Sequence, residues 1–194
     1  MCGIVGYIGN NNALPILVGG LKKLEYRGYD SSGVALIDCG KIETVRASGK
    51  ISALEDALKK HPVQGNIGIA HTRWATHGAP TVENAHPHQS FDGNISIVHN
   101  GIIENYAILK KKLQSEGIEF KSETDTEVVA HLIARYYKGN LKEAVLKAIS
   151  LIDGTFGLAV ICRDEPGTLI GARRGSPLIL GIGNNEYFLA SDVS

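Results

Sequence analysis

The sequence predicts an α+β protein with layered sheets rather than a doubly wound parallel fold. Short apolar stretches typical of strands occur in both halves of the chain, and apolar residues at helical spacing lie between them. These blocks differ in length and do not follow a regular β-α-β alternation. A hydrophobic share of 43% and 23 glycines indicate a globular fold with many tight turns. We expect one domain over residues 1–194.

Strands and helices follow one another irregularly in the first half of the chain. Apolar stretches predict strands at residues 3–9, 34–37, 42–45 and 67–70. Asp38-Cys39-Gly40 is expected to close the middle two strands into a hairpin. Helices are predicted between Leu14 and Leu24 and between residues 51 and 58. Asn12 is a suitable N-cap for the first helix, and Gly28 is placed to end it.

The second half contains a long polar segment, three predicted helices and further strands. Residues 78–92 show no periodicity, and such a loop in a compact domain is more often functional or mobile than idle. A strand over 95–99 is expected to stop at an Asn100-Gly101 turn. Helices are predicted from Ile102, from a Thr124–Glu127 capping box and from Leu141. Strands follow at residues 156–161, 168–172, 178–182 and 187–190.

Composition excludes several classes of partner. Lysine plus arginine equal aspartate plus glutamate at 20 each, so no charge excess points to nucleic acid or a membrane surface. The apolar runs are too short to span a bilayer and no basic-then-apolar leader is present, so we expect a cytoplasmic protein. Three cysteines without CxxC spacing argue against a disulfide framework or a zinc ribbon and fit a reducing compartment.

The first residues carry the most distinctive chemistry. If Met1 is removed, Cys2 holds a thiol and a free α-amine on one residue. These groups titrate at about 8.5 and about 7.7–8.0 in model peptides, so the amine can act as base for the thiol. We predict that the active form starts at Cys2 and that a chain retaining Met1 is inactive. The alternative is a buried cysteine that only packs.

Polar residues at predicted element ends suggest a substrate. Taken singly, Arg27 and Arg73 are ordinary ion-pair candidates, and Asp125 fits a helix N-terminus. Together they meet the needs of cysteine attack on an amide. The side-chain amide of Asn100 and the backbone N–H of Gly101 can stabilise an oxyanion. Arg73 can bind an α-carboxylate and Asp125 an α-ammonium, so the predicted substrate is L-glutamine.

Four histidines raise the alternative of a metal site. His71, His77, His86 and His88 lie close in sequence, but their spacing matches no usual helix-borne ligand pattern and no cysteine lies nearby. A structural or substrate-loop role is therefore favoured, and no metal or cofactor is expected. Cys39 and Cys162 are expected to be inert packing residues.

Five distinctive segments occur in order along the chain: residues 2–6 (CGIVG), 24–31 (LEYRGYDS), 71–78 (HTRWATHG), 98–105 (VHNGIIEN) and 122–127 (SETDTE). Together they resemble one family, the glutaminase domains of glucosamine-6-phosphate synthases among the class II glutamine amidotransferases. The amidophosphoribosyltransferases of the same superfamily are the alternative. They share the Cys-Gly-Ile start and an arginine after His-Thr, but resemble the segments at 25–30 and 74–78 less closely.

The resemblance implies a four-layer α/β/β/α N-terminal-nucleophile hydrolase sandwich with two antiparallel sheets. It implies that Cys2 is the nucleophile, that its freed α-amine is the base, and that Asn100 and Gly101 form the oxyanion hole. Arg27 would lie close to the nucleophile. The residues implied to hold glutamine are Arg73, Thr76, His77 and Asp125, with Trp74 on a loop that closes over the site.

The resemblance also implies that the chain is a C-terminally truncated fragment. Family members continue into sugar-phosphate isomerase domains that use the ammonia with fructose-6-phosphate, and the full-length enzyme is expected to be a homo-oligomer. The fragment is then expected to perform at most the glutaminase half-reaction. Two other hypotheses remain open at this point: a non-catalytic domain that binds glutamine or docks a partner, and a histidine-dependent metal hydrolase.

Overall fold

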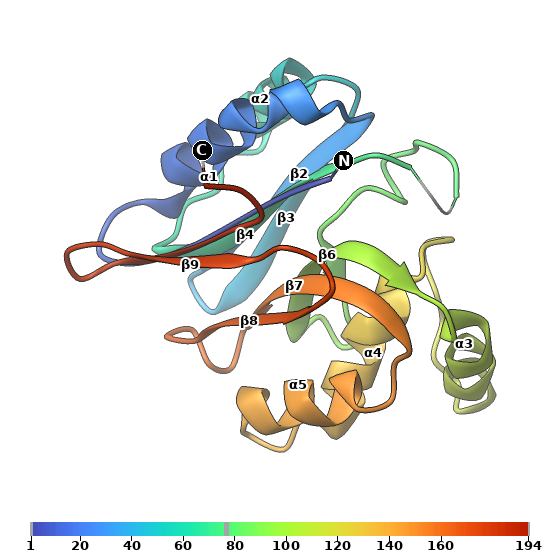
Figure 1. The fold of residues 1–194 in the computed structure, drawn as a ribbon. Helices are drawn as coiled ribbons and strands as arrows, with labels where there is room; N and C mark the ends of the chain where they lie inside the picture. The colour runs from blue at the N-terminus through green and yellow to red at the C-terminus, as the bar shows by residue number, and fades with distance from the viewer. Residues whose placement is uncertain (1, 76–77, 194) are drawn as a thin grey trace.

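Two antiparallel sheets form the centre of the molecule (Figure 1). The computed structural model describes residues 2–75 and 78–193. The six-stranded sheet has the order β3-β2-β4-β1-β10-β9, and the four-stranded sheet has the order β5-β6-β7-β8. The strands of the first sheet are β1 (Gly3–Ile8), β2 (Ser31–Asp38), β3 (Lys41–Ser48), β4 (Ile67–Arg73), β9 (Ile179–Ile182) and β10 (Tyr187–Ala190). Those of the second are β5 (His88–Gln89), β6 (Ile95–Ile103), β7 (Gly154–Cys162) and β8 (Leu169–Arg174).

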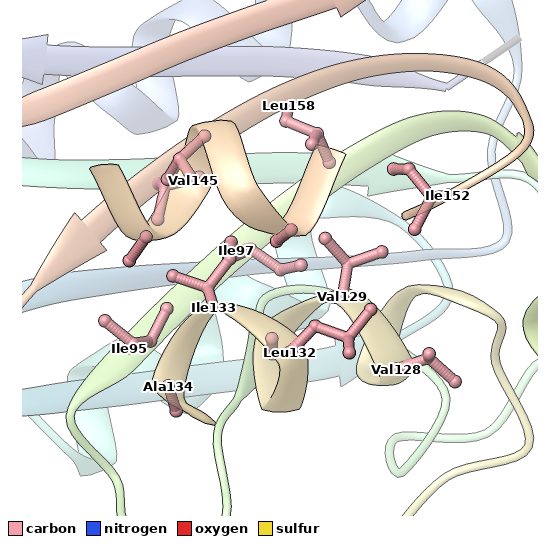
Figure 2. Close-up of a cluster of buried hydrophobic side chains, with 14 of the residues drawn as sticks. Ile95, Ile97, Val128, Val129, Leu132, Ile133, Ala134, Val145, Ile152 and Leu158 are labelled. Atoms are coloured by element: carbon pink, nitrogen blue, oxygen red, sulfur yellow. The ribbon is translucent and has the colours of Figure 1, made fainter. Parts of the chain in front are cut away.

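Helices cover the outer face of each sheet, which confirms the predicted four-layer α/β/β/α arrangement. Helices α1 (Ala13–Lys23) and α2 (Ile51–Lys60) pack on the six-stranded sheet, and a short 3-10 helix, η1 (Glu25–Arg27), follows α1. Helices α4 (Thr126–Tyr136) and α5 (Leu141–Ile149) lie against the four-stranded sheet, and α3 (Tyr106–Ser115) packs beside α4. Figure 2 shows part of the core that α4 and α5 share with β6 and β7.

The period-two alternation of the strands explains why the chain forms layers. In β1, Val5 and Tyr7 pack in the core beneath α1 and α2, whereas Ile4 packs between the two sheets. In β6, Ile95 and Ile97 face the core of α4 and α5, whereas Val98 faces the other sheet. Strands β1 and β6 are therefore apolar on both faces, and their side chains contribute to three hydrophobic cores.

Several local predictions are confirmed. Cys39 and Gly40 form a two-residue hairpin turn between β2 and β3, with φ angles of 47° and 76°. Asn12 caps α1, because its side chain accepts a hydrogen bond from the Leu14 N–H. The expected packing role of Cys39 is wrong, since this residue is exposed, whereas Cys162 is buried as predicted.

The predicted Asn100-Gly101 turn is wrong. Strand β6 continues through both residues to Ile103, and α3 begins only at Tyr106. Gly101 has a φ of 134° and pairs with Phe156 of β7. A Cβ atom at this position would lie 2.1 Å from the carbonyl oxygen of Thr155. The glycine is needed for a close approach of two strands rather than for a turn.

The predicted capping box at the start of α4 is also only partly right. The N-cap residue is Asp125, not Thr124. Glu127 does reach back, but it accepts hydrogen bonds from the backbone N–H groups of Lys121 and Ser122, at 2.8 and 2.7 Å. The side-chain hydroxyl of Thr124 instead bonds His88 Nε2 at 3.0 Å.

Within the described residues no helix is both long and apolar enough to cross a bilayer.

Candidate active site

Alternation on three strands brings the nucleophile candidate and its neighbours to one end of the inter-sheet core. Ile4 of β1, Ile69 of β4 and Val98 of β6 all pack between the sheets. Side chains two positions along each strand point to the same side. Cys2, His71 and Asn100 therefore lie at the polar end of this core, and Gly3 at the start of β1 pairs with Thr72 near the end of β4.

The Cys2 residue is held from three directions. Its Sγ accepts a hydrogen bond from the Trp74 N–H at 3.2 Å, and its carbonyl oxygen accepts one from Asn100 Nδ2 at 3.1 Å. The next residue, Gly3, donates its N–H to Thr72 Oγ1 at 3.0 Å. Burial raises the pKa of the Cys2 thiol, and the Trp74 N–H and the nearby Arg73 oppose this by favouring the thiolate.

A cavity of about 570 Å³ opens beside this thiol. This volume lies in the range of small-ligand pockets. Seven of the nine predicted site residues line it: Cys2, Arg27, Arg73, Trp74, Asn100, Gly101 and Asp125. The other two, Thr76 and His77, lie outside the described residues. A larger cavity of about 750 Å³ lies elsewhere, along β8, β9 and β10, and contains none of the predicted residues.

Asp125 does not cap its own helix. It occupies the N-cap position of α4, but its side chain makes no capping hydrogen bond there. Its Oδ2 instead accepts the Ile103 N–H at 2.8 Å, so the carboxylate is fixed against β6. The residue is 5% exposed and lines the cavity. A fixed carboxylate at a cavity wall can bind a cationic group.

The two arginines of the cavity have different neighbours. Arg73, which is 3% exposed, donates to the backbone carbonyl oxygens of Ala79 and Gly78 at 3.3 and 3.5 Å. Arg27 donates to the Ser191 hydroxyl at 3.2 Å and lies 3.9 Å from the Asp192 carboxylate. Arg73 thus connects the cavity to the loop after β4, whereas Arg27 connects it to the segment after β10.

Trp74 is 55% exposed at the mouth of the cavity. Its ring lies over Gly28, where an added Cβ would come within 2.9 Å of the indole. The adjacent Ala75 N–H donates to Asp30 Oδ2 at 2.5 Å. The contact with Asp30 therefore holds the Trp74–Ala75 segment in place, and the Trp74 N–H of this segment donates to the Cys2 thiol.

Sequence reasoning did not assign a role to Asp30 or Thr126, and it gave His71 only a general structural or substrate-loop role. Asp30 anchors Ala75, and His71 Nε2 lies 2.9 Å from Asn100 Oδ1. The Thr126 hydroxyl lies 2.9 Å from both His86 Nε2 and His99 Nδ1. All three residues belong to segments that carried the family resemblance, and this was the signal that could have found them.

The histidines form a buried stack next to the cavity. The ring centroids of His71 and His86 are 4.3 Å apart, and those of His86 and His88 are 4.6 Å apart. Burial lowers the pKa of His71 and of His88 to about 3, and lowers the pKa of His86 well below its usual value. The three rings are therefore neutral at pH 7. Across residues 2–75 and 78–193, no group of three or more His, Cys, Asp or Glu side chains is arranged to hold a metal ion.

We expect this stack to make the fold sensitive to acid. The folded-state pKa values of His71 and His88, about 3, lie below the ordinary value of 6.5, so the unfolded chain binds protons first as the pH falls. Their stabilising contribution is full above pH 6.5 and is lost as the pH falls toward 3. Each such histidine should lower the free energy of unfolding by about 1 kcal/mol per pH unit in this window.

Urea unfolding between pH 8 and pH 4 measures this effect, and His61→Gln is the control because His61 is exposed. A free energy of unfolding that stays flat between pH 7 and pH 5 would contradict the prediction. Glu127 adds to the loss at lower pH. Burial raises its pKa, but hydrogen bonds from His131 and from the Lys121 and Ser122 N–H groups lower it to about 2 overall.

Comparison with known proteins shows which family this chain belongs to. A family model described as "Glutamine amidotransferase domain" matches residues 71–194. The chain is 58% identical over 193 residues to the glutamine--fructose-6-phosphate aminotransferase [isomerizing] of Aquifex aeolicus, covering all of this chain and 33% of that protein. It is 56% identical to the protein of the same name from Clostridium tetani, covering 32% of it. The chain thus spans about a third of the length of these curated relatives.

Solved structures agree on the fold. The glutamine phosphoribosylpyrophosphate (PRPP) amidotransferase of B. subtilis matches with a TM-score of 0.84 at 29% identity, over 98% of this chain and 42% of that one. A glutamine aminotransferase class-II domain protein from Silicibacter pomeroyi matches with a TM-score of 0.64 at 16% identity, over 98% of this chain and 88% of that one. The amidophosphoribosyltransferase likeness is thus the more distant one, as the sequence motifs predicted. The chain belongs to the glutamine amidotransferase domain family.

Proposed function

We propose that this domain hydrolyses L-glutamine to glutamate and ammonia through a γ-glutamyl thioester on Cys2. The observation that carries the proposal is the position of the Cys2 thiol. It accepts a hydrogen bond from the Trp74 N–H at 3.2 Å at the wall of a cavity that also contains Asn100, Gly101 and Asp125. A nucleophile, oxyanion donors and a carboxylate for an ammonium group thus share one space.

The first half of the reaction forms the thioester. The Cys2 sulfur attacks the side-chain amide carbon of glutamine and loses its proton to a base. We assign that base to the α-amine of Cys2 after Met1 is removed. The carbonyl oxygen becomes an oxyanion, which Asn100 Nδ2 and the Gly101 N–H can stabilise. An amide nitrogen carries two hydrogens, so Asn100 can hold the Cys2 carbonyl with one and donate the other to the oxyanion.

The second half releases both products. The proton held by the base passes to the amide nitrogen, the C–N bond breaks, and ammonia leaves. Water then attacks the thioester carbon, the C–S bond breaks, and glutamate is released with the Cys2 thiol regenerated. The Trp74 N–H favours the sulfur anion in both halves because it donates to Sγ.

Binding groups for the two ends of free glutamine lie on different elements. We assign the substrate α-ammonium to the buried Asp125 carboxylate, and the α-carboxylate to Arg73. The Arg73 guanidinium has five N–H donors, so it can bind a carboxylate while it holds the carbonyl groups of Gly78 and Ala79. We assign Thr76 and His77 to the same substrate, Trp74 to a covering role, and Arg27 to a place close to the nucleophile.

In the longer protein we assign the ammonia to glucosamine-6-phosphate synthesis from fructose-6-phosphate. Relatives that are 58% and 56% identical to this chain are named glutamine--fructose-6-phosphate aminotransferase, and they are about three times as long. The isomerase domains, the fructose-6-phosphate site and homo-oligomer formation belong to that longer protein. The three free cysteines of this chain fit a reducing compartment, so we place the protein in the cytoplasm.

Covalent labelling followed by intact and peptide mass spectrometry tests the proposal. A glutamine analogue with an electrophilic side chain should add one adduct per chain, and the adduct should map to Cys2. L-glutamine should protect against the reaction. Exposed Cys39 is the internal control, because a label directed by thiol exposure alone would appear there first. The same intact mass reports whether Met1 has been removed.

Three outcomes would overturn the proposal. An adduct on Cys39 or Cys162, with Cys2 unmodified, would exclude Cys2 as the nucleophile. Saturable glutamine binding without glutamate release would support a non-catalytic binding domain instead. Activity lost to chelators and restored by zinc would support a metal hydrolase.

A further inference from the structure

We infer that His71 is a positioning residue for the oxyanion donor: its Nε2–H fixes the orientation of the Asn100 side-chain amide. The two residues lie on strands of different sheets, His71 on β4 and Asn100 on β6. Their side chains meet across the inter-sheet space, with Nε2 and Oδ1 2.9 Å apart. The inference rests on the proposed function, because it concerns the same oxyanion site.

The hydrogen-bond network allows one orientation of the Asn100 amide. Asn100 Nδ2 lies 3.1 Å from the Cys2 carbonyl oxygen, which can only accept. The nitrogen must therefore face Cys2, and Oδ1 must face His71. Because Oδ1 can only accept, the hydrogen of the pair has to come from His71 Nε2. In the opposite orientation, two oxygens would face each other at the nucleophile and no donor would point at the substrate.

The His71 ring is fixed in the state that this role requires. The residue is fully buried, and burial lowers its pKa to about 3, so the ring is neutral at pH 7 and carries one N–H. Asn100 Oδ1 can only accept, so the hydrogen of the 2.9 Å contact is carried by Nε2. The ring of His86 lies 4.3 Å away, centroid to centroid, and limits rotation. The single N–H therefore lies at Nε2.

Loss of this donor should act on the transition state more than on substrate binding. Without it, Oδ1 is left unpaired and the amide can rotate by 180°, which turns Nδ2 away from Cys2. The oxyanion exists only during reaction, so kcat falls while KM for glutamine changes little. Alkylation of Cys2 by iodoacetamide has no oxyanion, so its rate should not change.

Paired substitutions test the inference. His71→Gln places an amide N–H near the position of Nε2, whereas His71→Leu has no donor. We expect kcat of His71→Leu to fall about 10- to 100-fold with KM within about threefold, and His71→Gln to recover most of that loss. In an Asn100→Ala background, His71→Leu should cause no further loss of kcat. His131→Leu is the matched control, because it removes a buried histidine outside the cavity.

If His71→Leu does not fold, His71→Gln and His71→Asn give the same comparison with two polar side chains, of which the shorter cannot reach Oδ1. The inference is overturned if His71→Gln is no better than the variant without the donor. It is also overturned if KM rises at constant kcat, or if iodoacetamide alkylation slows in parallel with kcat. Cys2→Ala in the same assay distinguishes failure of the proposed function from failure of the positioning role. If Cys2→Ala still hydrolyses glutamine, the proposed function is refuted. If Cys2→Ala is inactive and His71→Leu has the kcat of the starting protein, only the positioning role is refuted.

Discussion

Cys2→Ala is expected to lower glutamine hydrolysis by more than about 10⁴-fold, which is the scale seen when a nucleophile is removed from a hydrolase. The substitution deletes one sulfur atom and keeps the backbone contacts from Asn100 and through Gly3. We therefore expect folding and glutamine binding to persist. Glutamate release measures the reaction, and isothermal titration with glutamine measures binding. Full loss of turnover with retained glutamine binding would show that the sulfur is needed for the reaction and not for the structure of the site.

Cys39→Ala is the matched control for that experiment. Cys39 lies in the exposed turn between β2 and β3, on a different part of the chain from the cavity. Its replacement should leave kcat within about twofold of the starting protein, as for surface changes away from a site. Equal losses in the two variants would indicate that thiol oxidation or aggregation, rather than the nucleophile, controls the measured activity.

Gly101→Ala is expected to damage both the fold and the oxyanion site. The φ of 134° is unfavourable for a residue with a side chain, and the new Cβ would lie 2.1 Å from the Thr155 oxygen and 2.7 Å from its carbonyl carbon. Both atoms are backbone in β7, so relief requires the β6–β7 pairing to open. We expect about 2–4 kcal/mol less stability and about 100-fold lower kcat.

Gly93→Ala separates the effect of a positive φ from the effect of a clash with the neighbouring strand. Gly93 also has a positive φ, 68°, but no atom lies within 4 Å of its added Cβ. This variant therefore reports the cost of backbone strain alone, about 1 kcal/mol, and should not change kcat. Urea unfolding and glutamate release measure both variants. Equal effects of the two substitutions would contradict the role of Gly101 as the point of closest approach between the strands.

Much of the fold could be predicted because its signals are local. Short apolar stretches in β1, β2 and β7 and helical spacing in α1 and α4 are properties of short windows of sequence. The wrong prediction of a turn at Asn100-Gly101 arose because the feature that decides this position is not local. The pair is a strong turn signal by itself, and only the approach of Thr155 explains why the glycine lies inside a strand. A glycine needed for a turn and one needed for contact with a distant strand have the same local sequence.

In the candidate site, too, some features could be predicted from the local sequence and others depend on contacts between distant strands. Cys2, Arg73, Asn100 and Asp125 were candidates because the chemistry of amide attack requires such groups, and the structure places all four around one cavity. The link from His71 to Asn100 could not be predicted, because it depends on which strands of the two sheets face each other. Residues that act on substrate are recognised by their chemical type, whereas residues that hold them in place are recognised only by contact.

The pairing of β1 with β10 sets the order in which the site can be assembled. The first strand lies between β4 and β10, and Ser191 exchanges hydrogen bonds with Ile4 through its hydroxyl and its backbone N–H. Arg27 donates to the same hydroxyl. A ribosome releases the cysteine first and Ser191 nearly two hundred residues later. The Cys2 thiol therefore leaves the ribosome long before β10 does, and the contacts of Ser191 with Ile4 and Arg27 form only after β10 is synthesised.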